Sequence, residues 1–268
     1  MKGAKKMPSL SDRTMSPLVK IMLIGHSGSG KTGALTSLAR AGYRIRVLDL
    51  DNGLDSLVNH LRAEEPAALE RVDYMSFRDK MRITPAGPVV DGAPRAFVNA
   101  VKALDKWEDG SEPATWGADS ILVIDSLTNL GRAAFWWAKA QNPGAKEPRQ
   151  WYFAAQSAIE DVIATATAEA FATNLIIMSH IDIVEQKDGT VQGFASTIGK
   201  ALGPKIPRYF NTLAALETKG QGAKVQRIIR TMPTALLTLK NPAPMKVEAE
   251  YPIETGLATL FSKLSGKA

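Results

Sequence analysis

Apolar stretches that end in polar residues recur along the chain and predict buried strands. Residues 120–126 and 174–180 are almost continuously apolar until they end in polar side chains. This pattern is typical of strands buried on both faces of a parallel sheet. Residues 18–24 have the same character, residues 43–51 end in carboxylates, and residues 72–77 alternate as expected at a sheet edge. We therefore predict a strand at each of these five stretches.

Helical segments separate the predicted strands, so strands and helices alternate. We predict helices at residues 33–40, 54–61, 96–107, 128–140 and 150–171. We predict loops at residues 80–94, 108–119 and 181–207. The alternation predicts an α/β fold with a mostly parallel central sheet flanked by helices.

The C-terminal part has a different pattern. Three short apolar stretches, at residues 211–217, 225–231 and 235–240, predict strands, and the glycines at 220 and 222 predict a turn after the first. We expect these strands to form an antiparallel extension of the main sheet, followed by a closing helix at residues 255–264. Residues 17–268 are then one domain.

The N-terminal sixteen residues lack an apolar period and carry four basic side chains. These are Lys2, Lys5, Lys6 and Arg13. We predict a flexible basic arm at residues 1–16. Such an arm could contact nucleic acid, although most tails of this kind only remain disordered.

Composition narrows the chemistry. The chain has 268 residues, of which 45% are hydrophobic, enough for a substantial core. It has no cysteine and only three histidines, which excludes disulfides and thiolate catalysis and disfavours a histidine-rich metal site. No apolar run reaches the roughly 20 residues of a membrane span, so we expect a protein without membrane contact, located in the cytoplasm.

A complete phosphate-binding motif follows the first predicted strand and precedes the first predicted helix. It fits G-x-x-x-x-G-K-[ST] and consists of Gly25, His26, Ser27, Gly28, Ser29, Gly30, Lys31 and Thr32. Its glycines let the backbone pass close to a polyphosphate, and its N–H groups form an anion-binding nest. Lys31 is expected to bridge phosphate oxygens, and the Thr32 hydroxyl to ligate Mg²⁺ that arrives with the nucleotide.

Two later strands end in residues that suit the same site. Asp125 closes the buried run 120–126, and the carboxyl ends of such strands are where ligands bind in doubly wound folds. We predict that Asp125 holds Mg²⁺ beside Thr32. The alternative is that Asp125 caps the following helix, a role that Ser126 could fill equally well. His180 ends the stretch 174–180 and could reach the γ-phosphate or the attacking water, unless it is an ordinary strand-end residue.

Two further features of the sequence each have two possible interpretations. Between residues 198 and 246 nine basic residues stand against Glu217 alone. This excess favours a polyanionic partner, or it only keeps the surface soluble. The aromatic run Phe135, Trp136 and Trp137 could stack on nucleic-acid bases, although packing against the core or another subunit is the commoner role.

These motifs together resemble the RecA-like ATPases, and most of all the short RecA-like recombination ATPases of bacteriophages that are linked to single-strand annealing. The segments that carry the resemblance are residues 25–32, 47–53, 121–128, 176–180 and, more weakly, 227–242. The Asp-Glu ending of the AAA+ Walker B strand is absent, since Ser126 follows Asp125, and no guanine-specificity signature is present. The resemblance implies an ATPase that uses ATP and Mg²⁺.

The resemblance also implies roles for individual residues. A glutamate after the second strand usually orients the hydrolytic water in that family. Asp51 matches its position, one methylene shorter, and Asp49 is the alternative. Relatives form rings or filaments in which a basic residue reaches a neighbouring subunit's phosphates, and Lys240 and Arg230 are the candidates here. The DNA-binding loop of relatives corresponds to residues 181–207.

The resemblance implies single-stranded DNA as partner, with a homo-oligomer that acts in recombination, repair or annealing. A single-strand-binding or other recombination protein could join it, in the host cytoplasm if the protein is phage-encoded. One alternative is a nucleotide-gated, ring-forming assembly protein whose partner is a protein. Another alternative is a DNA motor. The lack of any added helicase or nuclease domain in 268 residues argues against it.

Overall fold

The computed structural model describes Ser9, residues 16–186 and residues 188–266. The predicted N-terminal arm therefore lies outside the described residues, apart from Ser9 and Ser16. In the part of the chain that the structure describes, no helix combines the length and apolarity needed to cross a bilayer.

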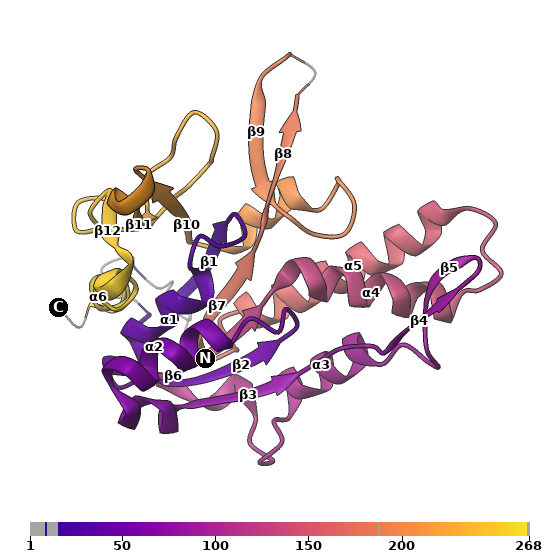
Figure 1. The fold of residues 1–268 in the computed structure, drawn as a ribbon, viewed down its shortest axis with the longest axis horizontal. Coiled ribbons are helices and arrows are strands. Elements are labelled where there is room, and N and C mark those ends of the chain that lie inside the picture. The colour runs from indigo at the N-terminus through magenta and orange to yellow at the C-terminus, as the bar shows by residue number, and fades with distance from the viewer. Residues whose placement is uncertain (1–8, 10–15, 187, 267–268) are drawn as a thin grey trace, which may run out of the picture.

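A mixed eight-stranded sheet forms the centre of the molecule (Figure 1). Its strands are β1 (Lys20–Gly25), β2 (Arg44–Asp49), β3 (Val72–Ser76), β6 (Gly117–Asp125), β7 (Thr173–Ser179), β10 (Thr212–Lys219), β11 (Gln226–Arg230) and β12 (Glu250–Pro252). Their order is β12-β11-β10-β1-β7-β6-β2-β3. The six strands from β10 to β3 are parallel, while β11 and β12 pair antiparallel at the C-terminal edge. The predicted α/β class and the antiparallel extension are confirmed.

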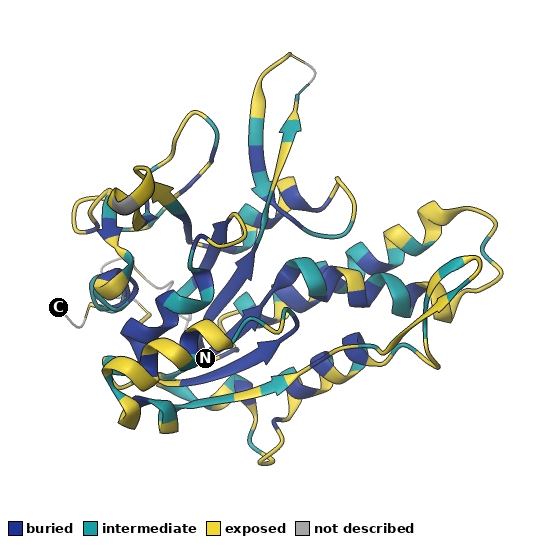
Figure 2. Ribbon diagram, viewed as in Figure 1, coloured by how far each residue is buried: buried dark blue, intermediate teal, exposed yellow. Residues whose placement is uncertain are grey.

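Helices cover both faces of the sheet. They are α1 (Lys31–Arg40), α2 (Asp55–Glu64), α3 (Ala96–Asp105), α4 (Leu127–Gln141), α5 (Pro148–Thr167) and α6 (Ile253–Ser265). One apolar cluster joins α1, α2 and α6 to the sheet, and a second joins α3, α4 and α5 to it. The central strands are buried on both sides (Figure 2), which explains their continuous apolar runs.

Two predicted loops contain hairpins instead. Residues 80–94 form β4 (Met81–Thr84) and β5 (Gly87–Val90), joined by a turn with Gly87 at φ 110°. Residues 181–207 form β8 (Ile181–Glu185) and β9 (Val191–Ala195), followed by the 3₁₀ helix η4 (Gly203–Tyr209). Both loop predictions were wrong because these strands are short and largely exposed, so they lack a buried apolar run.

The predicted strand at residues 235–240 was also wrong. This segment makes only isolated bridges, from Leu237 to Gly193 of the β8–β9 hairpin and from Lys240 to Leu213 of the central sheet. The hydroxyl of Thr234 accepts the N–H groups of Leu236 and Leu237, which favours a local turn over a ladder. The sheet edge is formed by β12, which sequence analysis missed because it has only three residues.

Candidate functional site

The phosphate-binding motif lies at the carboxyl end of β1 and leads into α1. Gly28 and Gly30 have φ values of 76° and 95°, where a side chain would be strained. The ammonium of Lys31 is buried and donates to the carbonyl oxygens of Gly25 and His26, at 2.8 and 3.1 Å. Burial lowers the pKa of Lys31, and the nearby carboxylates of Asp125 and Asp51 partly oppose this. The loop thus holds a cation at a helix N-terminus, as an anion-binding site requires.

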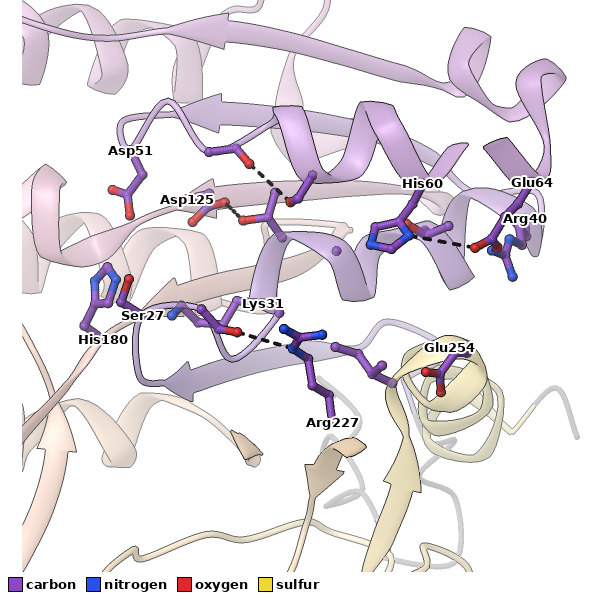
Figure 3. Close-up of a pocket in the computed structure, with 18 residues that line it drawn as sticks. Ser27, Lys31, Arg40, Asp51, His60, Glu64, Asp125, His180, Arg227 and Glu254 are labelled. Carbon is purple, nitrogen blue, oxygen red and sulfur yellow. Dashed lines mark hydrogen bonds and ion pairs between the residues drawn. The ribbon is translucent and has the colours of Figure 1, made fainter. Parts of the chain in front are cut away.

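A cleft of about 640 Å³ opens in front of this loop (Figure 3). Its lining includes most of the motif, and also Asp51, Asp125, His180 and Arg227. Gly25, His26 and Ser29 belong to the loop but are not part of the lining. Parallel pairing of β1, β7, β6 and β2 brings the ends of these strands to one edge, which is why residues distant in sequence meet here.

Asp125 and Thr32 are hydrogen-bonded to each other in the cleft. The Thr32 hydroxyl donates to Oδ2 of Asp125 at 2.7 Å, and Asp125 is 2% exposed. Burial raises the pKa of Asp125 to about 6, while the bond from Thr32 acts in the opposite direction. Ser126, joined to Asp125 by a cis peptide bond, is the N-cap residue of α4. Asp125 is therefore free of the capping role and faces the cleft.

Asp51 lies beyond the end of β2 and faces the same space. Its Oδ1 atom accepts hydrogen bonds from the Ser126 hydroxyl at 2.6 Å and from the side-chain amide of Asn129 at 2.7 Å. Asp49 has a different place: it is buried outside the cleft lining and accepts bonds from the Asn52 N–H and the Ser76 hydroxyl. Of the two acids that sequence analysis considered, only Asp51 lines the cleft.

His180 follows β7 and lines the cleft at the same end as Asp51 (Figure 3). Its Nδ1 lies 3.3 Å from the Thr128 hydroxyl, which donates to the carbonyl oxygen of Ser196 at 3.1 Å. Burial lowers the pKa of His180, and the charge of Lys31 lowers it further, so both favour the neutral ring.

Arg227 is a lining residue that sequence analysis did not assign to the site. It comes from β11, and its Nε donates to the Gly28 carbonyl oxygen at 3.3 Å. A Cβ on Gly30 would lie 3.0 Å from Cδ of Arg227 and 2.6 Å from Cδ1 of Ile253, so Gly30 also makes room for this contact. The only sequence signal was the general basic character of this region, because 199 residues separate Arg227 from Gly28.

Arg230 and Lys240, the two residues predicted to act on a neighbouring subunit, lie outside the cleft. Arg230 binds Glu217 and Glu250, both at 2.8 Å, and these carboxylates raise its pKa. Its guanidinium is therefore occupied within its own sheet, which argues against the predicted role. Lys240 is exposed, and its role between subunits stays a prediction.

The cleft suits a triphosphate with magnesium. Its size falls within the usual range of ligand sites, about 300–1,000 Å³. Thr32 and Asp125 offer adjacent hydroxyl and carboxylate oxygens, the hard ligands that Mg²⁺ prefers. Lys31 is held by two carbonyl oxygens that incoming phosphate oxygens could replace. The residues present therefore fit both groups.

Several solved structures are similar to this chain. The RadB recombinase matches with 17% identity, a TM-score of 0.49 and 90% of both chains covered. A KaiC-like protein from Pyrococcus horikoshii matches with 11% identity, a TM-score of 0.41 and 87% of this chain and 84% of that chain covered. The flagellar accessory protein FlaH from Methanocaldococcus jannaschii matches with 9% identity, a TM-score of 0.42 and 89% and 87% covered. A comparison with curated proteins found no match.

The profile of one protein family, AAA_24, described as an AAA domain, matches residues 18–243. This range includes the phosphate-binding loop, Asp51, Asp125, His180 and Arg227. The Asp-Glu pair that sequence analysis sought as an AAA+ signature is not required for this match, since Ser126 follows Asp125. The chain belongs to the AAA_24 family, described as an AAA domain, and has a mostly parallel central sheet flanked by helices.

Proposed function

We propose that this protein binds and hydrolyses ATP in the described cleft and acts on single-stranded DNA in recombination, repair or annealing. One observation carries the first part. Lys31, Thr32, Asp51 and Asp125 converge on one cleft from the ends of neighbouring strands. This set combines a phosphate-binding cation, two oxygen ligands for a metal and a carboxylate that can orient water.

Binding uses the loop and its lysine. The backbone N–H groups at the start of α1 contact phosphate oxygens, and Lys31 exchanges its two carbonyl partners for them. Thr32 Oγ1 and Asp125 would hold Mg²⁺, which would neutralise phosphate charge when bound. Because Lys31 is buried, its attraction to the developing negative charge is stronger than it would be in water.

Asp51 is placed to orient the attacking water. Its two donors, Ser126 and Asn129, both bind Oδ1 and fix the direction of the carboxylate. No hydrogen bond from another described residue to Oδ2 was found, so this oxygen can accept one from water in the cleft.

His180 offers a route from the phosphates to the β8–β9 hairpin. Its ring contacts Thr128, and both Thr128 and Ser179 donate to the carbonyl oxygen of Ser196, which directly follows β9. A γ-phosphate that moves His180 would therefore act on the base of the hairpin. Figure 1 shows this hairpin, in orange, extending away from the body of the molecule.

The charge of this hairpin opposes one part of the prediction for DNA. By resemblance, the segment 181–207 corresponds to the DNA-binding loop of relatives, which would need basic residues to contact phosphates. The hairpin instead exposes Asp182, Glu185 and Asp188. What supports a nucleic-acid partner is the net charge of +6 of the whole chain. The exposed basic residues of this segment, Lys200 and Lys205, follow the hairpin, so the charge argues against DNA contact by the hairpin itself and not by the whole segment.

The decisive experiment measures phosphate release from ATP and Mg²⁺, with and without single-stranded DNA. We expect slow turnover that DNA accelerates. Absence of turnover under both conditions, together with no nucleotide binding in calorimetry, would contradict the proposal. Turnover that ignores DNA at low salt would leave the ATPase intact and remove the DNA partner.

A second candidate is a nucleotide-gated assembly protein. It is favoured by the apolar side chains that the hairpin exposes, Ile183 at 48% and Val191 at 44%, beside its acidic residues. Exposed apolar surface of this kind suits a protein partner. This candidate predicts that ATP changes the particle mass in light scattering, while DNA changes neither mass nor turnover.

Arg227→Ala is expected to raise the KM for ATP about tenfold, the usual effect of losing one hydrogen bond to a charged group. Arg227 contacts the loop directly and lines the cleft, so its loss should affect binding more than kcat. Steady-state kinetics checks this, with Arg208→Ala as the matched control, because Arg208 is exposed in η4. An unchanged KM would remove Arg227 from the site.

Asp125→Asn is expected to stabilise the protein free of nucleotide and magnesium above about pH 7, by up to about 3 kcal/mol. The pKa of Asp125 is raised to about 6, so its ionisation costs the folded state stability as the pH rises from about 4 to 6. Asparagine avoids this cost. Thermal unfolding in chelator at about pH 4 and 7.5 checks the effect, which should vanish at the lower pH. Asp182→Asn, which removes an exposed carboxylate, should show no such difference.

A further inference from the structure

The far ends of α4 and α5 form a protruding arm with aromatic side chains on its surface. The two helices pack side by side and extend away from the sheet, joined by residues 142–147 (Figure 1). We call residues 132–153 the aromatic arm. Phe153 is 73% exposed and Tyr152 39% exposed, whereas most large apolar side chains of the core are almost fully buried. Figure 2 shows the end of the arm as largely exposed.

The rings of the arm form a connected set. The ring centres of Phe135 and Tyr152 are 4.8 Å apart, and those of Phe135 and Trp151 are 6.4 Å apart. Trp151 also donates to the carbonyl oxygen of Asn142 at 2.7 Å, which fixes the joining loop to α5. Phe135, Trp137 and Trp151 pack against the core, so the prediction that the aromatic run serves packing holds for its inner members. Tyr152 and Phe153 remain as outward faces on a rigid support.

The arm is also basic. It contains Arg132, Lys139, Lys146 and Arg149, against Glu147 as its single acid. All four basic side chains are exposed, and Glu147 is paired with Arg149 at 3.1 Å. The Lys139 ammonium lies over the rings of Trp136 and Trp151, at 5.2 and 5.3 Å. Cations interleaved with exposed rings are the combination that binds single strands, because bases stack on the rings and phosphates meet the cations.

The arm is connected to the cleft through a single helix. Asn129, in the first turn of α4, donates to Asp51, and Trp136 follows about two helical turns later. Residue 199 lies beside Tyr152: a Cβ on Gly199 would be 3.4 Å from Cδ1 of Tyr152. The side-chain amide of Gln156 donates to the neighbouring Ile198 carbonyl oxygen at 2.9 Å. The arm is therefore joined to the cleft by α4, and its Tyr152 lies beside the segment that follows β9.

We propose that the aromatic arm is the binding surface for single-stranded DNA, with Phe153 and Tyr152 stacking on bases and Lys146 and Arg149 contacting phosphates. This inference rests on the DNA partner of the proposed function and assigns it a place. It differs from the expectation for residues 181–207, whose β8–β9 hairpin exposes acidic side chains. The arm offers the opposite charge together with aromatic faces.

Fluorescence anisotropy with a labelled oligothymidylate tests the proposal on the full chain. Phe153→Ala is expected to weaken binding about tenfold, the usual effect of losing one stacking ring. The double variant Lys146→Gln/Arg149→Gln is expected to weaken binding and to lower the salt slope by about 0.7 for each lost phosphate contact. Tyr74→Ala is the matched control, since Tyr74 is 62% exposed on β3, the edge strand of the sheet, and lies outside the arm. It should bind like the unmodified protein.

The possible outcomes distinguish an error in the binding site from an error in the proposed DNA partner. If the unmodified protein binds no oligothymidylate at low salt, the DNA partner itself is wrong. If it binds, and the arm variants bind equally well with the same salt slope, the DNA partner stands and this site is overturned. If the variants lower the particle mass in light scattering and bind DNA normally, the arm is an interface between copies of the chain, which also overturns the proposal. Circular dichroism and DNA-free ATP turnover should match the unmodified protein in every variant.

Discussion

Lys31→Ala is expected to lower ATP turnover by at least about a hundredfold, the usual cost of removing one preorganised charge from a transition state. Lys31 donates to two carbonyl oxygens of the loop, and its burial keeps water from screening it. We also expect a nucleotide analogue to lose most of its stabilising effect on thermal unfolding, because binding to the folded state alone produces that effect. Phosphate release and thermal unfolding with analogue measure the two losses.

The control for Lys31 is Lys102→Ala, which removes an exposed lysine from α3. It should leave turnover and analogue stabilisation unchanged. If Lys31→Ala turned over ATP at the unmodified rate, the assignment of the cleft as the catalytic site would be wrong. If turnover fell but analogue still stabilised the protein fully, Lys31 would act only on the transition state.

Asp51→Asn is expected to lower kcat by about 10²–10⁴-fold, the range for a group that assists proton transfer from water. The amide oxygen can still accept the bonds from Ser126 and Asn129, so the fold of the site should persist. Nucleotide affinity should therefore change little, and the loss should lie in kcat. Calorimetric binding of the analogue and single-turnover kinetics separate these two quantities.

Two further variants sharpen this prediction. Asp51→Glu should also lose activity, because Ser126 and Asn129 fix the shorter carboxylate. Asp55→Asn removes an exposed carboxylate four residues away and should leave kcat unchanged. Full activity in Asp51→Asn combined with a loss in Asp49→Asn would transfer the role to Asp49, against its position outside the cleft lining.

The central strands and the phosphate-binding loop were predictable because their signals are local. A strand buried on both faces needs a continuous apolar run, and a loop that approaches phosphates needs glycines at fixed spacing. Asp125 and His180 could be found for a related reason. Each ends a buried run, and the ends of neighbouring parallel strands meet at one edge.

The exposed parts were harder to predict. The strands of the hairpins β4–β5 and β8–β9 bury little apolar surface, so no apolar period marks them. The stretch 235–240 had the composition of a strand, but the side chain of Thr234 diverts its backbone into a turn. The pairing of charged side chains was also not predictable from local patterns. Arg230 forms ion pairs with Glu217 on β10 and with Glu250 on β12.

The sequence by itself determined the α/β class, the phosphate-binding loop and the acid that ends β6, because each depends on residues that are neighbours in the chain. Only the tertiary structure decided that Asp51 rather than Asp49 faces the cleft, that Arg227 contacts the loop, and that Tyr152 and Phe153 lie on the surface. These facts depend on contacts between residues far apart in sequence. Such contacts are fixed by how the strands pair and how the helices pack, and no local pattern records them.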